Sequence, residues 1–124
     1  MSAIRQPGRI NENTTLIDIG MYGVVGAAAV YLIEGDKKCL IDGGTRTEAP
    51  QVVETLRELD AFPPDILIAT HAHYDHAQGI PILRKEAARE RKRIEVLASR
   101  EAIPLLEDPS MKSLTPAHMK EYRT

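Results

Sequence analysis

The stretch of sequence that decides the fold is DILIATHAHYDH, residues 65–76. Its first half, residues 65–70, is a compact apolar run typical of a β-strand that is buried on both faces. Its second half, residues 71–76, contains three of the four histidines of the chain and an aspartate. Strands buried on both faces occur in sheets that carry flanking helices, and the loops after their ends are candidate sites. This stretch therefore predicts an α/β fold with a site directly after a central strand.

Three further strands are expected upstream, because turn residues divide that part of the chain into short pieces. They cover residues 14–19, 27–34 and 37–42. The second and third are joined by Gly35 and Asp36, which favours a hairpin. Since a hairpin is antiparallel, the sheet is predicted to be mixed.

Helices are expected between and after the strands, where apolar residues recur at helical spacing. The first begins near Thr47, after a capping-box pattern at residues 45–48. The second begins near Pro81, and a third covers residues 99–106 after a strand at residues 94–98. The residues expected to face the core are Val52, Val53, Leu56 and Leu59 in the first helix and Ile80, Leu83 and Ala87 in the second.

Length, charge and apolar stretches limit the classes of protein that fit. The 124 residues are enough for one domain. Sixteen Lys and Arg against eighteen Asp and Glu give a net charge of −2, which supplies no general attraction to nucleic acid or to an acidic membrane. The longest apolar stretch, residues 23–33, is shorter than the roughly 20 residues of a membrane span, and the amino terminus lacks the apolar core of a secretory signal. We therefore expect a single-domain cytoplasmic protein that does not bind membranes.

The histidine segment, residues 71–76, is a candidate metal centre. Residues two apart in an extended chain project to the same side, so His71 and His73 can bind one metal ion. Asp75 and His76 follow where the chain enters the next helix, close enough to hold a second ion. Two ions about 3.5 to 4 Å apart can share a hydroxide that attacks a substrate. The alternatives are a histidine cluster in a polar loop and a single metal site that serves only stability.

At these residues the chain resembles the metallo-β-lactamase-fold superfamily, whose signature is His-x-His-x-Asp-His after a buried strand. Residues 71–76 match that signature without a gap, and residues 41–44 (Ile-Asp-Gly-Gly) look like the strand-ending Asp-x-Gly of the family. The order of elements over about 85 residues, from 14 to 98, is similar to the amino-terminal half of its αββα sandwich. The resemblance implies a four-layer α/β (α+β) fold of which residues 1–124 supply the amino-terminal half. Residues 108–124 are polar and contain Pro109 and Pro116, and we expect them to form a polar, disordered or truncated tail.

The resemblance also implies roles for individual side chains. His71 and His73 would bind the first metal ion, and Asp75 and His76 the second. The ions would be zinc, one or two per chain, although iron also accepts these ligands. Asp75 would in addition accept a proton or orient the attacking water. Asp42 would hold the metal loop by accepting an imidazole N–H, the alternative being a simple turn former.

The chain departs from the family in its ligand set. Family members supply another histidine, a bridging aspartate and a final histidine from their carboxyl-terminal half, and none of these is recognisable here. Only His118 lies downstream, in a context that predicts a helix start. Half of a two-sheet sandwich also leaves an apolar sheet face uncovered. We therefore expect the remaining half of the fold, or a second copy of the chain, to cover that face.

The preferred function is a metal-dependent hydrolase of a small-molecule ester, thioester or lactone. Met21 and Tyr22, between two glycines, and Tyr74 are candidates for contact with the substrate, the alternatives being an ordinary glycine turn and a packing role. A phosphodiesterase or nuclease is the second reading, for which the basic run at residues 84–93 could bind the polyanion; a solvated helix face is the expectation for that run. A metal-binding or interaction module without turnover is the third. The single cysteine, Cys39, is predicted to be a partly buried strand thiol and not a nucleophile.

Overall fold

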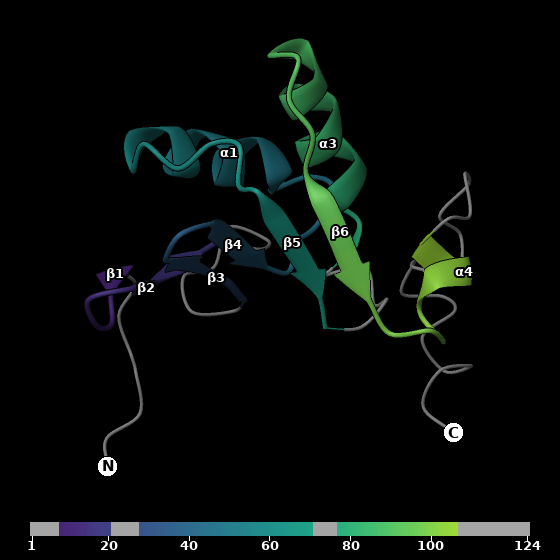
Figure 1. Cartoon of the computed structure of the whole chain (residues 1–124), viewed down its shortest axis with the longest axis horizontal. Coiled ribbons are helices and arrows are strands. Elements are labelled where there is room, and N and C mark those ends of the chain that lie inside the picture. Colours follow the sequence, from purple (N-terminus) through teal and green to yellow (C-terminus); the bar gives the residue numbers. More distant parts are fainter. Residues whose placement is uncertain (1–7, 21–27, 71–76, 107–124) are drawn as a thin grey trace.

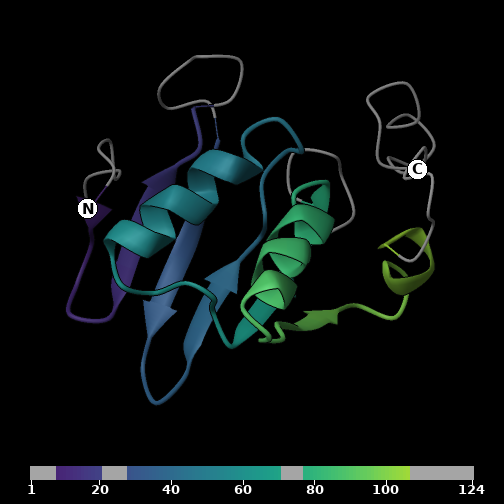
Figure 2. The ribbon, with the colours of Figure 1, turned by 90° about the horizontal axis from the view of Figure 1, so that it is seen from above.

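A six-stranded mixed β-sheet, with two helices packed on one face, forms the body of the computed structural model (Figures 1 and 2). The structure describes residues 8–20, 28–70 and 77–106. The strands are β1 (Gly8–Arg9), β2 (Thr14–Asp18), β3 (Ala29–Glu34), β4 (Lys38–Ile41), β5 (Ile66–Ala69) and β6 (Glu95–Ala98). The helices are α1 (Ala49–Glu58), α3 (Ile80–Arg89) and the short α4 (Ile103–Leu106). This is the mixed sheet with flanking helices that the sequence predicts.

The strands lie in the sheet in the order of the sequence, from β1 to β6. Strands β1 to β4 are antiparallel neighbours, whereas β4, β5 and β6 run parallel to one another. It follows that β2, β4, β5 and β6 all point the same way and end at one edge of the sheet. We call this edge the carboxyl edge. The loops that leave it include the one that continues into the histidine segment.

The predicted strands are confirmed to within two residues at each end, and the first two helices are confirmed as well. The turn before α1 joins Thr45 and Glu48, the two ends of the predicted capping box: the Glu48 N–H donates to Thr45 Oγ1 at 3.1 Å, and the Thr45 hydroxyl donates to the Glu48 carboxylate. The N-cap residue of α1 is Glu48 and not Thr45, however, and its side chain does not cap the helix. The hairpin between β3 and β4 pairs Glu34 with Lys38.

Two details of the prediction are wrong. Leu59 was expected in the core but is 40% exposed, because α1 ends at Glu58 and the helical period no longer sets the direction of its side chain. The third helix was expected from Ser99 but covers only Ile103–Leu106. Ser99 starts a turn instead, in which its hydroxyl oxygen and its carbonyl oxygen both accept the Ala102 N–H. The predicted tail at residues 108–124 lies outside the described residues.

The core lies between the sheet and the helices α1 and α3. Every second residue of the central strands points into it, as the two-residue period of a strand requires. These side chains pack against the inward faces of both helices in a single hydrophobic cluster. Its principal members are Ile17, Val30, Leu32, Leu40, Leu67, Val52, Val53, Leu56, Ile80, Leu83 and Ala87.

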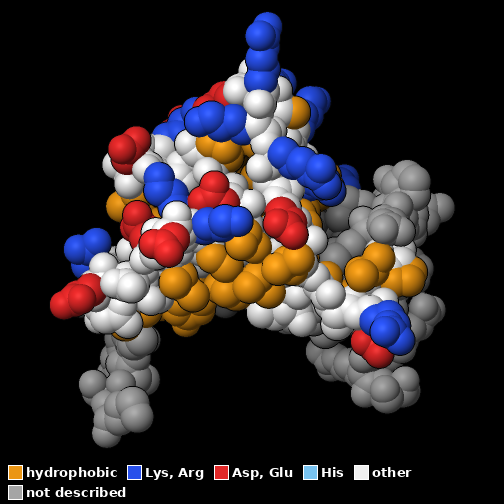
Figure 3. Space-filling model, viewed as in Figure 1, with side chains coloured by type: hydrophobic (Ala, Val, Ile, Leu, Met, Phe, Trp, Pro, Cys, Tyr) orange, Lys and Arg blue, Asp and Glu red, His pale blue; other side chains and the backbone are white. Residues whose placement is uncertain are grey.

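The opposite face of the sheet, which we call the open face, is also apolar. Cross-strand pairing aligns its side chains in two rows, one of which runs from Leu16 through Tyr31, Ile41 and Ile68 to Leu97. Tyr31 and Leu97 are exposed, and α1 and α3 lie on the other side of the sheet (Figure 2). Figure 3 shows hydrophobic side chains gathered over the strands, below the charged side chains around the helices. The second row contains Ile33, Cys39 and Ile66.

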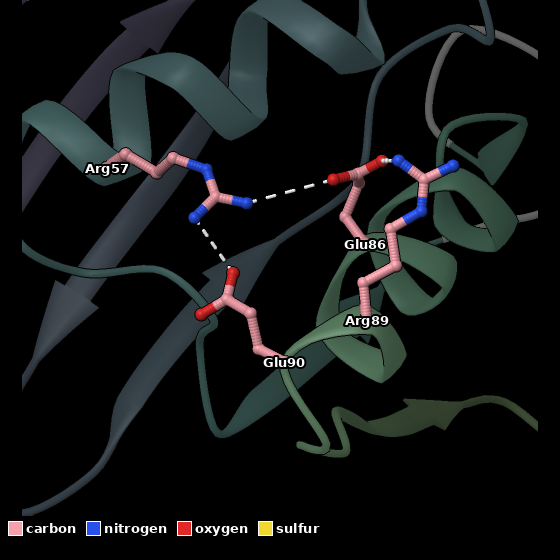
Figure 4. Close-up of polar contacts among 4 residues, drawn as sticks. All are labelled: Arg57, Glu86, Arg89 and Glu90. Atoms are coloured by element: carbon pink, nitrogen blue, oxygen red, sulfur yellow. Dashed lines mark hydrogen bonds and ion pairs between the residues drawn. The ribbon is translucent and has the colours of Figure 1, made fainter.

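Charged side chains link the two helices on their outer surface (Figure 4). Arg57 of α1 pairs with Glu90 at 2.8 Å and with Glu86 at 3.7 Å, and Glu86 also pairs with Arg89 at 2.9 Å. The Arg57 guanidinium lies over the ring of Phe62, 4.6 Å from its centre. Both acidic residues of the basic run at 84–93 are therefore paired. None of the described helices has the length and apolar character that a membrane crossing requires.

Candidate metal centre

The frame around the histidine segment is described, whereas the segment itself is not. The predicted ligands His71, His73, Asp75 and His76 lie outside the described residues, as do the candidate substrate contacts Met21, Tyr22 and Tyr74. Within the part of the chain that the structure describes, no group of three or more His, Cys, Asp or Glu side chains could hold a metal ion. The geometry of the candidate site is thus defined by the residues on either side of the segment.

Parallel pairing places Asp42 beside Thr70, the residue that precedes His71. Strands β4 and β5 are neighbours, with Ile41 opposite Ile68, and the Asp42 N–H donates to the Ile68 carbonyl oxygen at 2.8 Å. Both strands end at the carboxyl edge, so the histidine segment leaves the sheet directly next to Asp42. A strand-end carboxylate beside a histidine-rich loop is the arrangement that the sequence predicts.

The Asp42 side chain is buried and bonded to Thr70. It is 6% exposed, and its carboxylate accepts the Thr70 backbone N–H at 2.8 Å. The Thr70 hydroxyl lies 2.9 Å from each of the two carboxylate oxygens. Asp42 has a φ of 68°, in the left-handed region that Asp and Asn tolerate better than most residues. Asp42 therefore does more than form a turn, because its carboxylate fixes the residue from which the segment begins. The predicted bond from an imidazole to Asp42 involves residues outside those described.

The chain that follows the histidine segment contacts the same loop. The Gly79 N–H, at the start of α3, donates to the Gly44 carbonyl oxygen at 2.9 Å. Residues 42–44, which we call the 42–44 turn, therefore contact the chain on both sides of residues 71–76. Neither Thr70 nor Gly79 stands out in the sequence as a site residue. The only signal for them is their position just before and just after the motif.

A second carboxylate, Asp18, lies at the carboxyl edge where β2 ends. It is half-buried, and it accepts the Gly20 N–H at 2.8 Å. The Ile19 N–H donates to the Ala28 carbonyl oxygen at 3.2 Å, which extends the pairing of β2 with β3 beyond both strands. Sequence reasoning did not single out Asp18, since an aspartate before a glycine is common in turns. The loop that contains Met21 and Tyr22 thus leaves the same edge as the histidine segment.

Cys39 lies in β4, away from this edge, and is half-buried as predicted. Burial raises the pKa of its thiol, because the charged thiolate loses contact with water. A thiol with a raised pKa is a poor nucleophile near neutral pH. The candidate chemistry of the described frame therefore lies at the carboxyl edge and not at the cysteine.

Comparisons with known proteins identify the family of the chain. The sequence profile of the Metallo-beta-lactamase superfamily matches residues 23–108. None of the curated proteins matches the chain significantly. Among solved structures, a B3 metallo-β-lactamase described as the first with an active-site glutamic acid is 28% identical, with a TM-score of 0.64, over 83% of this chain and 35% of its own.

Two more solved structures have the same fold. SMB-1, in a complex with mercaptoacetic acid, is 25% identical, with a TM-score of 0.67, over 86% of this chain and 38% of its own. FIM-1 from Pseudomonas aeruginosa, in its mono-zinc form, is 18% identical, with a TM-score of 0.61, over 86% of this chain and 46% of its own, and shows the fold alone. The chain thus spans between about a third and a half of the length of these structures. Because the superfamily profile covers more than half of its residues, the chain belongs to the metallo-β-lactamase superfamily.

Proposed function

We propose that the chain carries the metal-binding part of a zinc-dependent hydrolase, in which His71, His73, Asp75 and His76 hold one or two zinc ions. The observation that supports this most is the buried Asp42 carboxylate, which fixes Thr70 next to His71 at the carboxyl edge. Imidazole and carboxylate groups are ordinary zinc ligands, so the donor set fits the metal. Members of the superfamily are typically zinc hydrolases, and the FIM-1 structure contains zinc by its own description.

Each of these side chains has a defined task in the proposed reaction. When bound, zinc lowers the pKa of a water ligand to about 7 and so supplies a hydroxide near neutral pH. The imidazoles of His71 and His73 must be neutral to bind zinc. The Asp75 carboxylate, next to His76, accepts a proton or orients the attacking water. Asp42 keeps the start of the segment in place through Thr70.

The substrate class that we propose is a small ester, thioester or lactone. The solved structures that the chain resembles are named β-lactamases, and a β-lactam, like an ester, thioester or lactone, has a carbonyl group that activated water could attack. The net charge of −2 gives no reason to expect a polyanionic substrate. Met21, Tyr22 and Tyr74 are the proposed substrate contacts.

One observation favours a second candidate, a phosphodiesterase or nuclease. All six basic side chains of residues 84–93 are exposed, and Lys and Arg side chains gather around the end of α3 at the top of Figure 3. Such a surface would bind a phosphate backbone in a salt-dependent manner. The end of α3 lies opposite the carboxyl edge, however. Its basic side chains could therefore hold the backbone of a long polymer, but they could not position the bond that is cleaved.

Metal analysis combined with a substrate panel tests the proposal. The purified chain is expected to retain about one or two equivalents of zinc and to hydrolyse an activated ester, thioester or lactone. Turnover of bis(p-nitrophenyl) phosphate alone would favour the second candidate. Bound zinc with no turnover of any substrate would show that the chain is a metal-binding module. A chain that excludes zinc and iron after incubation with excess metal would contradict the proposal.

The replacement Asp42→Ala is expected to weaken zinc binding by about 10 to 100-fold, because residues that orient metal ligands have effects of this size. The Thr70 N–H would also lose its acceptor, which lowers the free energy of unfolding by about 1–3 kcal/mol. Zinc titration and urea unfolding measure the two effects.

Asp65→Ala is the matched control for this variant. The Asp65 carboxylate accepts the Lys38 N–H at 2.8 Å, at the opposite edge of the same two strands. Its loss should lower stability and leave the affinity for zinc unchanged. Equal affinities of the two variants for zinc would mean that Asp42 has only a general structural role.

A further inference from the structure

The 42–44 turn contacts the chain on either side of the histidine segment, at Thr70 and at Gly79, through different atoms. At the amino end, the contact is the carboxylate side chain of Asp42, which accepts both the N–H and the hydroxyl of Thr70. At the carboxyl end, the contact is the backbone of Gly43 and Gly44, against which Gly79 is packed. Because the two contacts share no atoms, each can be altered without removing the other.

Residue 79 must be glycine because of this packing and not because of its backbone conformation. Its φ of −76° and ψ of −16° are helical values that any residue can adopt. A Cβ at this position, however, would lie 2.1 Å from the Gly43 carbonyl oxygen and 3.1 Å from the Gly44 carbonyl oxygen. Both of these are backbone atoms, which cannot turn aside as a side chain could. Any residue larger than glycine must therefore push the start of α3 away from the 42–44 turn.

The first turn of α3 is hydrogen-bonded to Gly79. The Leu83 N–H donates to the Gly79 carbonyl oxygen at 3.0 Å, which forms the first helical hydrogen bond there. Ile80 and Leu83 also lie close to Gly43, where a Cβ would be 3.1 Å from Ile80 Cγ1 and 3.3 Å from Leu83 Cδ1. A displacement at Gly79 would be passed on to Asp75 and His76, which precede it by four and three residues along the chain. Thr70, in contrast, is adjacent to His71.

We propose that Thr70 and Gly79 are positioning residues for different metal ligands. Thr70 positions His71 and His73 through Asp42, and Gly79 positions Asp75 and His76 through the backbone of the 42–44 turn. The inference rests on the proposed zinc site and adds that the two halves of that site are held independently. A change at one anchor then weakens one bound ion more than the other.

Zinc titration of the whole chain tests the inference. Zinc is added to the metal-free protein in competition with a chromophoric chelator. A His76→Ala variant identifies the zinc equivalent whose binding depends on the second half of the segment. Gly79→Ala is expected to weaken that equivalent by about 10 to 100-fold and the other by less than about threefold. Thr70→Val, which removes the hydroxyl at nearly constant volume, is expected to show the reverse pattern. Thr70→Ser should restore wild-type binding, since it keeps the hydroxyl.

Gly35→Ala is the matched control, because a Cβ at Gly35 meets only the Lys37 carbonyl oxygen, at 4.0 Å. It should bind zinc as the wild type does. If Gly79→Ala does not fold, as judged by circular dichroism, Gly43→Ala provides a milder displacement of the same contact. A Cβ at Gly43 would lie 3.1 Å from Ile80 Cγ1, 3.2 Å from the Ile80 backbone nitrogen and 3.3 Å from Leu83 Cδ1, whereas a Cβ at Gly79 would lie 2.1 Å from its nearest atom. The same selective loss is expected.

Equal weakening of every bound zinc ion by Thr70→Val and Gly79→Ala, or no weakening by either, would overturn the inference and leave the proposed function standing. A wild-type chain that binds no zinc would overturn both. The two failures are therefore distinguishable in a single set of titrations.

Discussion

Replacing His71 and His73 together by alanine is expected to abolish zinc binding, with a dissociation constant raised at least about 1,000-fold, or about 4 kcal/mol. Zinc sites in proteins use three or four protein ligands, and the double variant leaves only Asp75 and His76 of the proposed set. Hydrolysis should be lost with the metal. Zinc content after dialysis and equilibrium titration measure the effect.

The control for this variant is His118→Ala, which removes the one histidine outside the motif. It should leave both zinc content and affinity unchanged. Retention of zinc by the double variant would show that the ligand assignment is wrong. Loss of zinc in His118→Ala would instead make His118 a ligand.

Leu67→Ala is expected to lower the free energy of unfolding by about 3.5 kcal/mol, the middle of the range for a fully buried leucine. Leu67 is completely buried in β5, in the cluster between the sheet and the helices α1 and α3. Its truncation leaves a cavity under both helices, next to the strand that carries the histidine segment. Urea unfolding followed by circular dichroism measures the change. A loss below about 1 kcal/mol would contradict the described core.

Leu97→Ala provides the comparison from the other side of the sheet. Leu97 lies in the neighbouring strand β6, opposite Ile68, and is 45% exposed on the open face. The same truncation should therefore cost less than about 1 kcal/mol. A loss as large as that of Leu67→Ala would show that the open face is covered in solution, as expected if another part of the fold or a second copy packs against it.

Much of the fold could be predicted because its signals are local. The apolar run at residues 65–70 predicts β5, Gly35 and Asp36 predict the hairpin, and helical spacing predicts α1 and α3. The errors lie where local signals end. Leu59 continues the apolar spacing of α1, but the helix stops one residue earlier. The segment after β6 was expected to be helical from Ser99. A turn at Ser99 takes up the first residues of this segment, so the helix begins only at Ile103.

The frame of the candidate site was predicted only in part, because its contacts join distant residues. Asp42 could be identified from its position at a strand end and from the family signature. Its partner Thr70 lies 28 residues away, and only the parallel pairing of β4 with β5 shows that the two meet. Gly79 needs to be glycine because of the Gly43 backbone, a requirement that no local pattern of sequence reveals.

The central claim is that residues 71–76 bind zinc, and the zinc X-ray absorption spectrum of the loaded chain tests it most directly. The account predicts nitrogen and oxygen ligands at about 2.0–2.2 Å, with the outer-shell scattering of imidazole rings. The variant that lacks His71 and His73 should retain no zinc and therefore give no such spectrum. A spectrum with sulfur at about 2.3 Å, or with water ligands alone, would contradict the claim.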